Sequence, residues 1–200
     1  MSEVTFFYDF SSPFAYLGAT QIERVAREAG ARVRFSPMLL GAVFKAIGTP
    51  IVPIAAASEP KRRYLQRDVL DWAGYWQEPF AWPSRFPMRT VLPLRLVLAV
   101  DEAQHAPLMH AIFRAYWAED RDISDPAVLS SLLAASNIDA SALDRAQSDP
   151  APKQALVDAT DRALAAGVCG APSFLVRTHL FWGQDRLDFV RAALQGWTPE

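Results

Sequence analysis

Cysteine is almost absent from this sequence of 200 residues, since Cys169 is the only one. A single cysteine cannot close an internal disulfide, and it cannot supply the pair of thiols that dithiol redox chemistry requires. Any thiol chemistry must therefore use a sulfur atom from a bound molecule. We expect Cys169 itself to be a small buried side chain, because free cysteines are among the most buried residue types.

Histidine is also scarce, with His105, His110 and His179 the only three in the chain. The first two are five residues apart, a spacing that does not place them on one face of a helix. The sequence also lacks the G-x-S-x-G motif of serine hydrolases. These absences count against a metal site and against hydrolysis by a serine–histidine–acid triad.

Neither charge nor hydrophobicity is concentrated anywhere in the chain. The net charge is -2 and the isoelectric point is near 5.9, which leaves no broad basic surface for nucleic acid. No run reaches the roughly 18 apolar residues of a membrane span, and Glu3 lies where a secretory signal would be basic. We expect a cytoplasmic protein that binds a small molecule, without a membrane or nucleic-acid partner.

The periodicity of apolar residues is that of a sheet at both ends of the chain. Alternation predicts strands over 4–10 and 31–37, and helical spacing between them runs from Pro13 to a stop at Gly30. After Gly167, "GVCGAPSFLV" and "THLFWG" predict two short strands joined by a tight turn, and "QDRLDFVRAAL" predicts a last helix.

Between about Pro60 and Gly167 every periodic segment is helical, with Pro107 expected to divide one helix from the next. The order of elements predicts an α/β protein with a thioredoxin-like fold and a large all-helical insertion domain. The thioredoxin-like domain would comprise 1–55 and 166–200, and the helical domain 56–165.

The segment "DFSSPFAYLG" joins the first strand to the first helix. With Pro13 at the first helical position, Ser12 is predicted to be the N-cap. Its hydroxyl can also donate a proton to an anion at the helix N-terminus, where a bound thiol would ionise more readily. A serine that only caps the helix needs no ligand, so the motif alone leaves both roles open. Asp9 is expected to be a hydrogen-bonded turn acid.

The stretch "FFYDFSSPFAYLG" resembles the N-terminal motif of the bacterial 2-hydroxychromene-2-carboxylate isomerases and of their relatives, the kappa-class glutathione transferases. Six further segments resemble this family in the same order: "LLGAVFKAIG", "PKRRYLQRDVLDWA", "WPSRFPMRTVLPLRLVLA", "AYWAEDRDISDP", "GVCGAPSFLV" and "FWGQDRL". In DsbA-like oxidoreductases this corner carries C-x-x-C, whereas here it is Ser12, Pro13, Phe14 and Ala15.

The resemblance implies glutathione as the cofactor, with Ser12 as the catalytic residue that donates to its thiolate. It also implies a cis Ala171–Pro172 bond that faces the cysteine portion of glutathione. The γ-glutamyl end would meet Gln184 and Asp185, with Asp185 as N-cap of the last helix, and Lys61 would reach the tripeptide. The predicted pocket for a small aromatic carboxylate comprises Phe14, Trp82 and Arg89. The family further suggests a homodimer.

The reaction implied by the resemblance is the interconversion of 2-hydroxychromene-2-carboxylate and trans-o-hydroxybenzylidenepyruvate in naphthalene-type degradation. One alternative is a kappa-class glutathione transferase that conjugates or reduces electrophiles. Another is a non-catalytic module that binds glutathione or thiol peptides.

Two segments depart from the family pattern. Gly48, Thr49 and Pro50 replace a Gly-Asn pair of many relatives, and Arg89 replaces a frequent asparagine, where it could bind a substrate carboxylate. The aromatic residues Trp72, Trp76, Phe80, Trp82 and Phe86 could line a substrate pocket or simply belong to the core.

Overall fold

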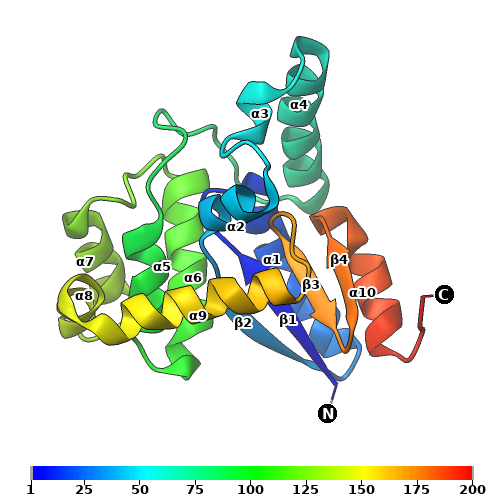
Figure 1. The fold of residues 1–200 in the computed structure, drawn as a ribbon. Coiled ribbons are helices and arrows are strands. Elements are labelled where there is room, and N and C mark those ends of the chain that lie inside the picture. The colour runs from blue at the N-terminus through cyan, green and yellow to red at the C-terminus, as the bar shows by residue number, and fades with distance from the viewer. Residues whose placement is uncertain (1, 200) are drawn as a thin grey trace.

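The computed structural model describes residues 2–199, which form a mixed four-stranded sheet surrounded by helices (Figure 1). The strand order is β2-β1-β3-β4, with bounds β1 (Glu3–Tyr8), β2 (Arg32–Pro37), β3 (Ser173–Val176) and β4 (His179–Trp182). β1 runs parallel to β2 and antiparallel to β3, and β3 and β4 form a hairpin. The predicted thioredoxin-like fold is confirmed. Met1 and Glu200, which fall inside the predicted domain ranges, lie outside the described residues.

Helices cover both faces of the sheet. α1 (Pro13–Glu28) packs beside α10 (Leu187–Leu194) on one face, and α9 (Pro150–Ala165) crosses the other (Figure 1). The remaining helices are α2 (Leu40–Ile47), α3 (Pro53–Ala56), α4 (Glu59–Trp76), α5 (Val91–Leu98), α6 (Glu102–Trp117), α7 (Pro126–Ala135), α8 (Ser141–Ser148) and the short 3-10 helix η1 (Gln184–Arg186). Within the described part of the chain, the segment from α3 to α9 contains no strand, as the sequence predicted.

The helical segment is not uniform in its packing. α5 to α8 lie together at one end of the sheet, whereas α3 and the start of α4 project beyond it (Figure 1). α9 contacts β2 and α2 as well as α5, so it joins the helical part to the sheet. Among residues 2–199, no helix has both the length and the apolar character needed to cross a bilayer.

The prediction that Pro107 divides two helices is wrong. α5 ends at Leu98, and α6 runs without interruption from Glu102 to Trp117 with Pro107 inside it. The proline removes only one N–H donor from the helix. Leu108, Met109 and Ile112, which follow it, are fully buried, and their packing compensates for the lost bond.

Candidate functional site

Ser12 lies at the N-terminus of α1, where the sequence placed it. Its backbone is extended (φ -101, ψ 118), and its Oγ accepts a hydrogen bond from the Ala15 N–H at 3.1 Å. Pro13 begins the helix as a residue that needs no N–H partner. The predicted N-cap is therefore confirmed. The same hydroxyl donates to the carbonyl oxygen of Ala171 at 2.8 Å, although Ser12 is only 7% exposed.

The loop that approaches Ser12 from the other end of the chain contains the cis Ala171–Pro172 bond, as predicted. A Cβ at Gly18 of α1 would lie 3.2 Å from Pro172 Cγ, so glycine at this position lets α1 approach the loop closely. The Gly183 N–H donates to the Pro172 carbonyl at 3.0 Å and fixes the loop to the end of β4.

A cavity of about 860 Å³ opens beside Ser12. It lies among the N-terminus of α1, the cis-proline loop, α2, α3, α4 and η1. The predicted site residues that line it are Ser12, Phe14, Lys61, Trp82, Ala171, Pro172, Gln184 and Asp185. Arg89 is not one of the lining residues, and its side chain is exposed in the segment before α5. The structure therefore does not bring Arg89 to this cavity.

Aromatic side chains form much of the cavity wall. The lining includes Phe14, Phe44, Tyr64, Trp72, Trp82, Phe86 and Trp182, whereas Trp76 and Phe80 pack against the core instead. The loop that carries Trp82 and Phe86 is held to α6, because the Ala81 N–H donates to the Trp117 carbonyl at 2.7 Å. Tyr116 Oη donates to the Arg85 carbonyl at 3.1 Å. The wall is suited to a planar apolar ligand.

Charged side chains lie on one side of the cavity. Lys61 and Asp68 come from α4, and Asp185 and Arg186 come from η1. Burial raises the pKa of Asp68 above its ordinary value, and the negative charge of Asp185 raises it further. Asp68 and Asp185 are near enough for their charges to interact, so together they favour a bound cation, whereas Lys61 can contact an anion. Such a rim fits a ligand that carries both signs of charge.

Asp68 and Trp182 were not predicted as site residues, although the sequence contains signals for both. Asp68 follows Lys61 by seven residues, a spacing that returns to the same face of a helix. Trp182 directly precedes the Gly183–Gln184–Asp185 turn in "FWGQDRL". A Cβ on Gly170 would lie 2.4 Å from Trp182 Nε1, so the indole rests on the loop next to Ala171.

Asp185 does not cap the last helix, which corrects the sequence prediction. Gln184 and Asp185 form η1, and α10 then begins after Arg186 without a side-chain cap. Gly183 has φ 112, a left-handed conformation that starts this additional turn. The turn aims Asp185 at the cavity rim, where its Oδ2 lies 3.4 Å from Arg186 Nε.

The burial expected for Cys169 is also wrong, because this residue is exposed. It follows the exit from α9 and lies outside the cavity lining, although its neighbour Gly170 belongs to that lining. Nor do residues 2–199 contain a group of three or more histidine, cysteine or acidic side chains arranged to hold a metal ion.

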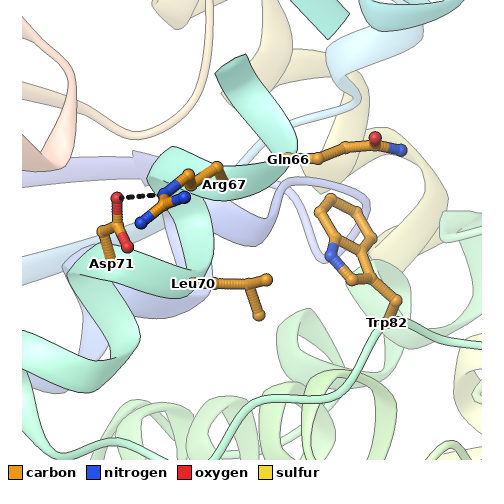
Figure 2. A pocket seen from close by; sticks show the side chains of 5 residues that line it. All are labelled: Gln66, Arg67, Leu70, Asp71 and Trp82. Atoms are coloured by element: carbon orange, nitrogen blue, oxygen red, sulfur yellow. Dashed lines mark ion pairs between the residues drawn. The ribbon is translucent and has the colours of Figure 1, made fainter. Parts of the chain in front are cut away.

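A second, more open pocket of about 500 Å³ lies on the outer side of α4 (Figure 2). Gln66, Leu70 and Trp82 line it, and the Arg67 and Asp71 side chains pair with each other across one helical turn at 3.4 Å. Its lining includes no residue of the Ser12 turn or of the cis-proline loop, and Trp82 is the one residue that it shares with the larger cavity.

The fold and the site together define a thioredoxin-fold protein with a serine at the N-cap of its first helix. The chain belongs to the family of the DSBA-like thioredoxin domain, whose model matches residues 3–195.

The curated relatives cover nearly the whole chain. A 2-hydroxychromene-2-carboxylate isomerase of Pseudomonas putida is 29% identical over 96% of this chain and 93% of its own length. Glutathione S-transferase kappa 2 of Caenorhabditis elegans is 27% identical over 96% of this chain and 93% of its own length. The solved structure of a 2-hydroxychromene-2-carboxylate isomerase superimposes with a TM-score of 0.79 at 26% identity, covering 96% of this chain and 94% of that one. These relatives support an enzyme of the isomerase and kappa-transferase type.

Proposed function

We propose that this protein is a glutathione-dependent isomerase that interconverts 2-hydroxychromene-2-carboxylate and trans-o-hydroxybenzylidenepyruvate, or a closely related aromatic pyruvate. The observation that carries the proposal is the position of the Ser12 hydroxyl, at the N-terminus of α1, beside cis-Pro172 and inside a cavity lined by aromatic side chains. The names of its relatives point to the same chemistry.

The site fits glutathione in size, charge and hydrogen bonding. A cavity of about 860 Å³ lies within the usual range for small-molecule sites. Asp68 and Asp185 suit the ammonium group of the γ-glutamyl end, and Lys61 suits a carboxylate. The backbone of Ala171 lies beside Ser12, where a peptide portion of the ligand could pair with it.

When bound, glutathione would supply a thiolate that adds reversibly to the conjugated double bond of the substrate, so that rotation about that bond becomes free. The chain holds this sulfur and keeps it ionised. Ser12 donates its hydroxyl proton to the sulfur as a hydrogen bond, and the N-terminus of α1 adds a favourable partial positive charge. Trp82, Phe86 and Trp182 position the aromatic ring and exclude water, which raises the effective concentration of the reacting groups.

A spectrophotometric assay with the open-form substrate tests the proposal. Isomerisation should require glutathione, and the concentration of free thiol should remain constant during turnover. Isomerisation at the same rate without glutathione would refute the proposal.

The kappa-class transferase is the second candidate, because three curated relatives carry that name at 23–27% identity. It would use the same Ser12 and the same cavity, but the sulfur would remain attached to the product. Loss of free thiol in proportion to product would favour the transferase over the isomerase. A dithiol oxidoreductase is not a candidate, because the chain has one cysteine.

A further inference from the structure

The carboxyl group of Asp9 is buried directly behind Ser12, and it takes no part in the cavity lining. Asp9 follows the last residue of β1 and is 1% exposed. Its Oδ1 accepts a hydrogen bond from the Ser11 N–H at 2.9 Å, and its backbone carbonyl accepts one from the Ser12 N–H at 3.2 Å. The turn that carries the Ser12 hydroxyl is therefore closed by Asp9 from both its side chain and its backbone.

The second carboxylate oxygen of Asp9 reaches a different element. Oδ2 accepts a hydrogen bond from the Leu40 N–H at 2.8 Å, in the first turn of α2. The N-cap of α2 is Leu39, whose side chain cannot cap, so Asp9 takes over that role from a distant position. α2 supplies Leu40 and Phe44 to the cavity wall. One side chain thus connects the Ser12 turn to the opposing wall.

This arrangement calls for a carboxylate rather than an amide. Both oxygens of Asp9 accept from backbone N–H groups that belong to separate segments. An asparagine would direct its NH₂ group at one of these donors, and two donors cannot form a hydrogen bond. The Thr90 side chain, at the N-cap of α5, lies near enough to Asp9 to lower the pKa of its carboxyl group. Asp9 is therefore the meeting point of three segments that converge behind the site.

We infer that Asp9 is a positioning residue, whose carboxylate holds the Ser11–Ser12 turn against α2 and so sets the direction of the Ser12 hydroxyl toward the cavity. This inference rests on the proposed function for the identity of the ligand. The geometry of the turn can be tested without any ligand.

Asp9→Asn and Thr160→Val form the matched pair of variants. Thr160 Oγ1 accepts from the Leu39 N–H at 3.0 Å, next to the Leu40 N–H that Asp9 binds. Thr160 is 5% exposed and does not line the cavity. Thr160→Val thus removes this bond to the same end of α2, together with the bond that Thr160 Oγ1 donates to the Leu156 carbonyl at 2.8 Å, and leaves the Ser12 turn intact.

Hydrogen exchange of the ligand-free protein is the first measurement. The Ala15 N–H bonds to both Ser12 Oγ and the Ser12 carbonyl oxygen, each at 3.1 Å, so its exchange rate reports on the geometry of the turn that carries the Ser12 hydroxyl. In Asp9→Asn we expect the Ser11 and Ala15 amides to exchange about tenfold faster, and in Thr160→Val we expect them to stay within about twofold of wild type. Equal effects of the two variants would reduce Asp9 to a purely structural residue and overturn the inference.

The thiolate absorbance of bound glutathione near 240 nm is the second measurement. We expect Asp9→Asn to lower the ratio of thiolate to thiol about tenfold, with a change below about threefold in the dissociation constant of S-methylglutathione, which has no thiolate to hold. Thr160→Val should leave this ratio within about twofold of wild type. An unchanged ratio in Asp9→Asn would also overturn the inference.

The two proposals fail in different ways. Wild-type protein that does not ionise glutathione would refute the proposed function, while the exchange rates would still decide the role of Asp9. Should Asp9→Asn fail to fold, Thr90→Val removes the neighbouring hydroxyl group that favours the ionised form of Asp9 and keeps the carboxylate. It should then change the Ala15 exchange rate in the same direction by about threefold, and no change would overturn the inference.

Discussion

The Ser12 hydroxyl donates its proton to the carbonyl oxygen of Ala171, a residue 159 positions later in the chain. This bond, 2.8 Å long, joins the start of α1 to the cis-proline loop. The Ser12 hydroxyl has a single proton to donate. A thiolate that accepts a hydrogen bond from it must therefore replace the Ala171 carbonyl oxygen as the acceptor. The exchange is favourable because hydrogen bonds to a charged acceptor are about twice as strong as bonds between neutral groups.

Replacing Ser12 by alanine should reduce turnover strongly and stability modestly. Loss of a hydrogen bond to a charged sulfur costs about 1.5–3 kcal/mol, or roughly ten- to hundredfold in rate. Loss of the N-cap should lower the free energy of unfolding by about 1 kcal/mol. Steady-state kinetics and urea denaturation measure the two effects separately.

Ser36→Ala is the matched control for that variant. Ser36 in β2 is 7% exposed, as Ser12 is, but it lies outside the cavity lining. Its removal should leave turnover within about twofold of wild type, since surface and core serines without a partner contribute little. If Ser12→Ala retained wild-type turnover, Ser12 would be only a helix cap.

The acidic side of the cavity should bind the ammonium group of glutathione. Asp185→Asn removes one of the two acids there, so we expect the dissociation constant of S-methylglutathione to rise about tenfold at pH 7. Asp188→Asn is the control, because Asp188 is 86% exposed, pairs with Arg191 and does not line the cavity. Isothermal titration calorimetry distinguishes the two, and equal affinities for both variants would exclude an ammonium site at Asp185.

Most of the fold and the N-cap position of Ser12 could be predicted from the sequence, because the signals for them are local. Ser12 followed by Pro13 determines a helix start within four residues, and the alternating apolar residues of β1 determine a buried strand. The failures involve choices that depend on the rest of the molecule. Pro107 lies inside α6 because buried neighbours compensate for its missing N–H, and this compensation is not visible in local sequence.

The predictions for Asp185 and Arg89 also failed because they depend on how distant parts of the chain pack. Asp185 resembles an N-cap, but Gly183 introduces an additional 3-10 turn that moves the start of α10 to Leu187. Arg89 lies in one of the segments that resemble the family, yet its side chain is exposed to solvent. The seven-residue spacing from Lys61 places Asp68 on the same face of α4, but the spacing does not show that this face lines the cavity, because that depends on the orientation of the whole helix.

Tyr8 and Tyr16 should respond in opposite ways to removal of the hydroxyl group. Tyr8 Oη is fully buried and has no hydrogen-bond partner among the described residues, whereas Tyr16 Oη donates to the Pro79 carbonyl at 2.7 Å. Tyr8→Phe should therefore leave the free energy of unfolding unchanged or raise it by about 1 kcal/mol, while Tyr16→Phe should lower it by about 1 kcal/mol. Urea denaturation measures both, and a loss of stability in Tyr8→Phe equal to that in Tyr16→Phe would contradict this assignment.

The pH dependence of stability should separate Asp9 from Glu23. Burial raises the pKa of Asp9 above its ordinary value of 3.8, even though hydrogen bonds from Ser11 and Leu40 act in the opposite direction. The carboxyl group of Asp9 therefore binds its proton more tightly in the native state than in the unfolded state. The contribution of Asp9 to stability is complete below pH 3.8 and is lost as the pH rises through the raised pKa.

Glu23 should behave in the opposite way. The hydrogen bond with His110 lowers the pKa of Glu23, so the contribution of Glu23 to stability is present above pH 4.5 and is lost on acidification.

Urea denaturation between about pH 2 and pH 7, an interval that includes the range in which carboxyl linkage acts, tests the predicted direction of the pH effect for both residues in one series. Relative to wild type, Asp9→Asn should gain stability as the pH rises, because the variant lacks the carboxyl group whose ionisation is penalised by burial. Glu23→Gln should lose stability relative to wild type over the same interval, because it cannot form the charged hydrogen bond with His110 at 2.6 Å. Parallel pH profiles for Asp9→Asn and wild type would mean that Asp9 ionises as easily in the native state as in the unfolded chain.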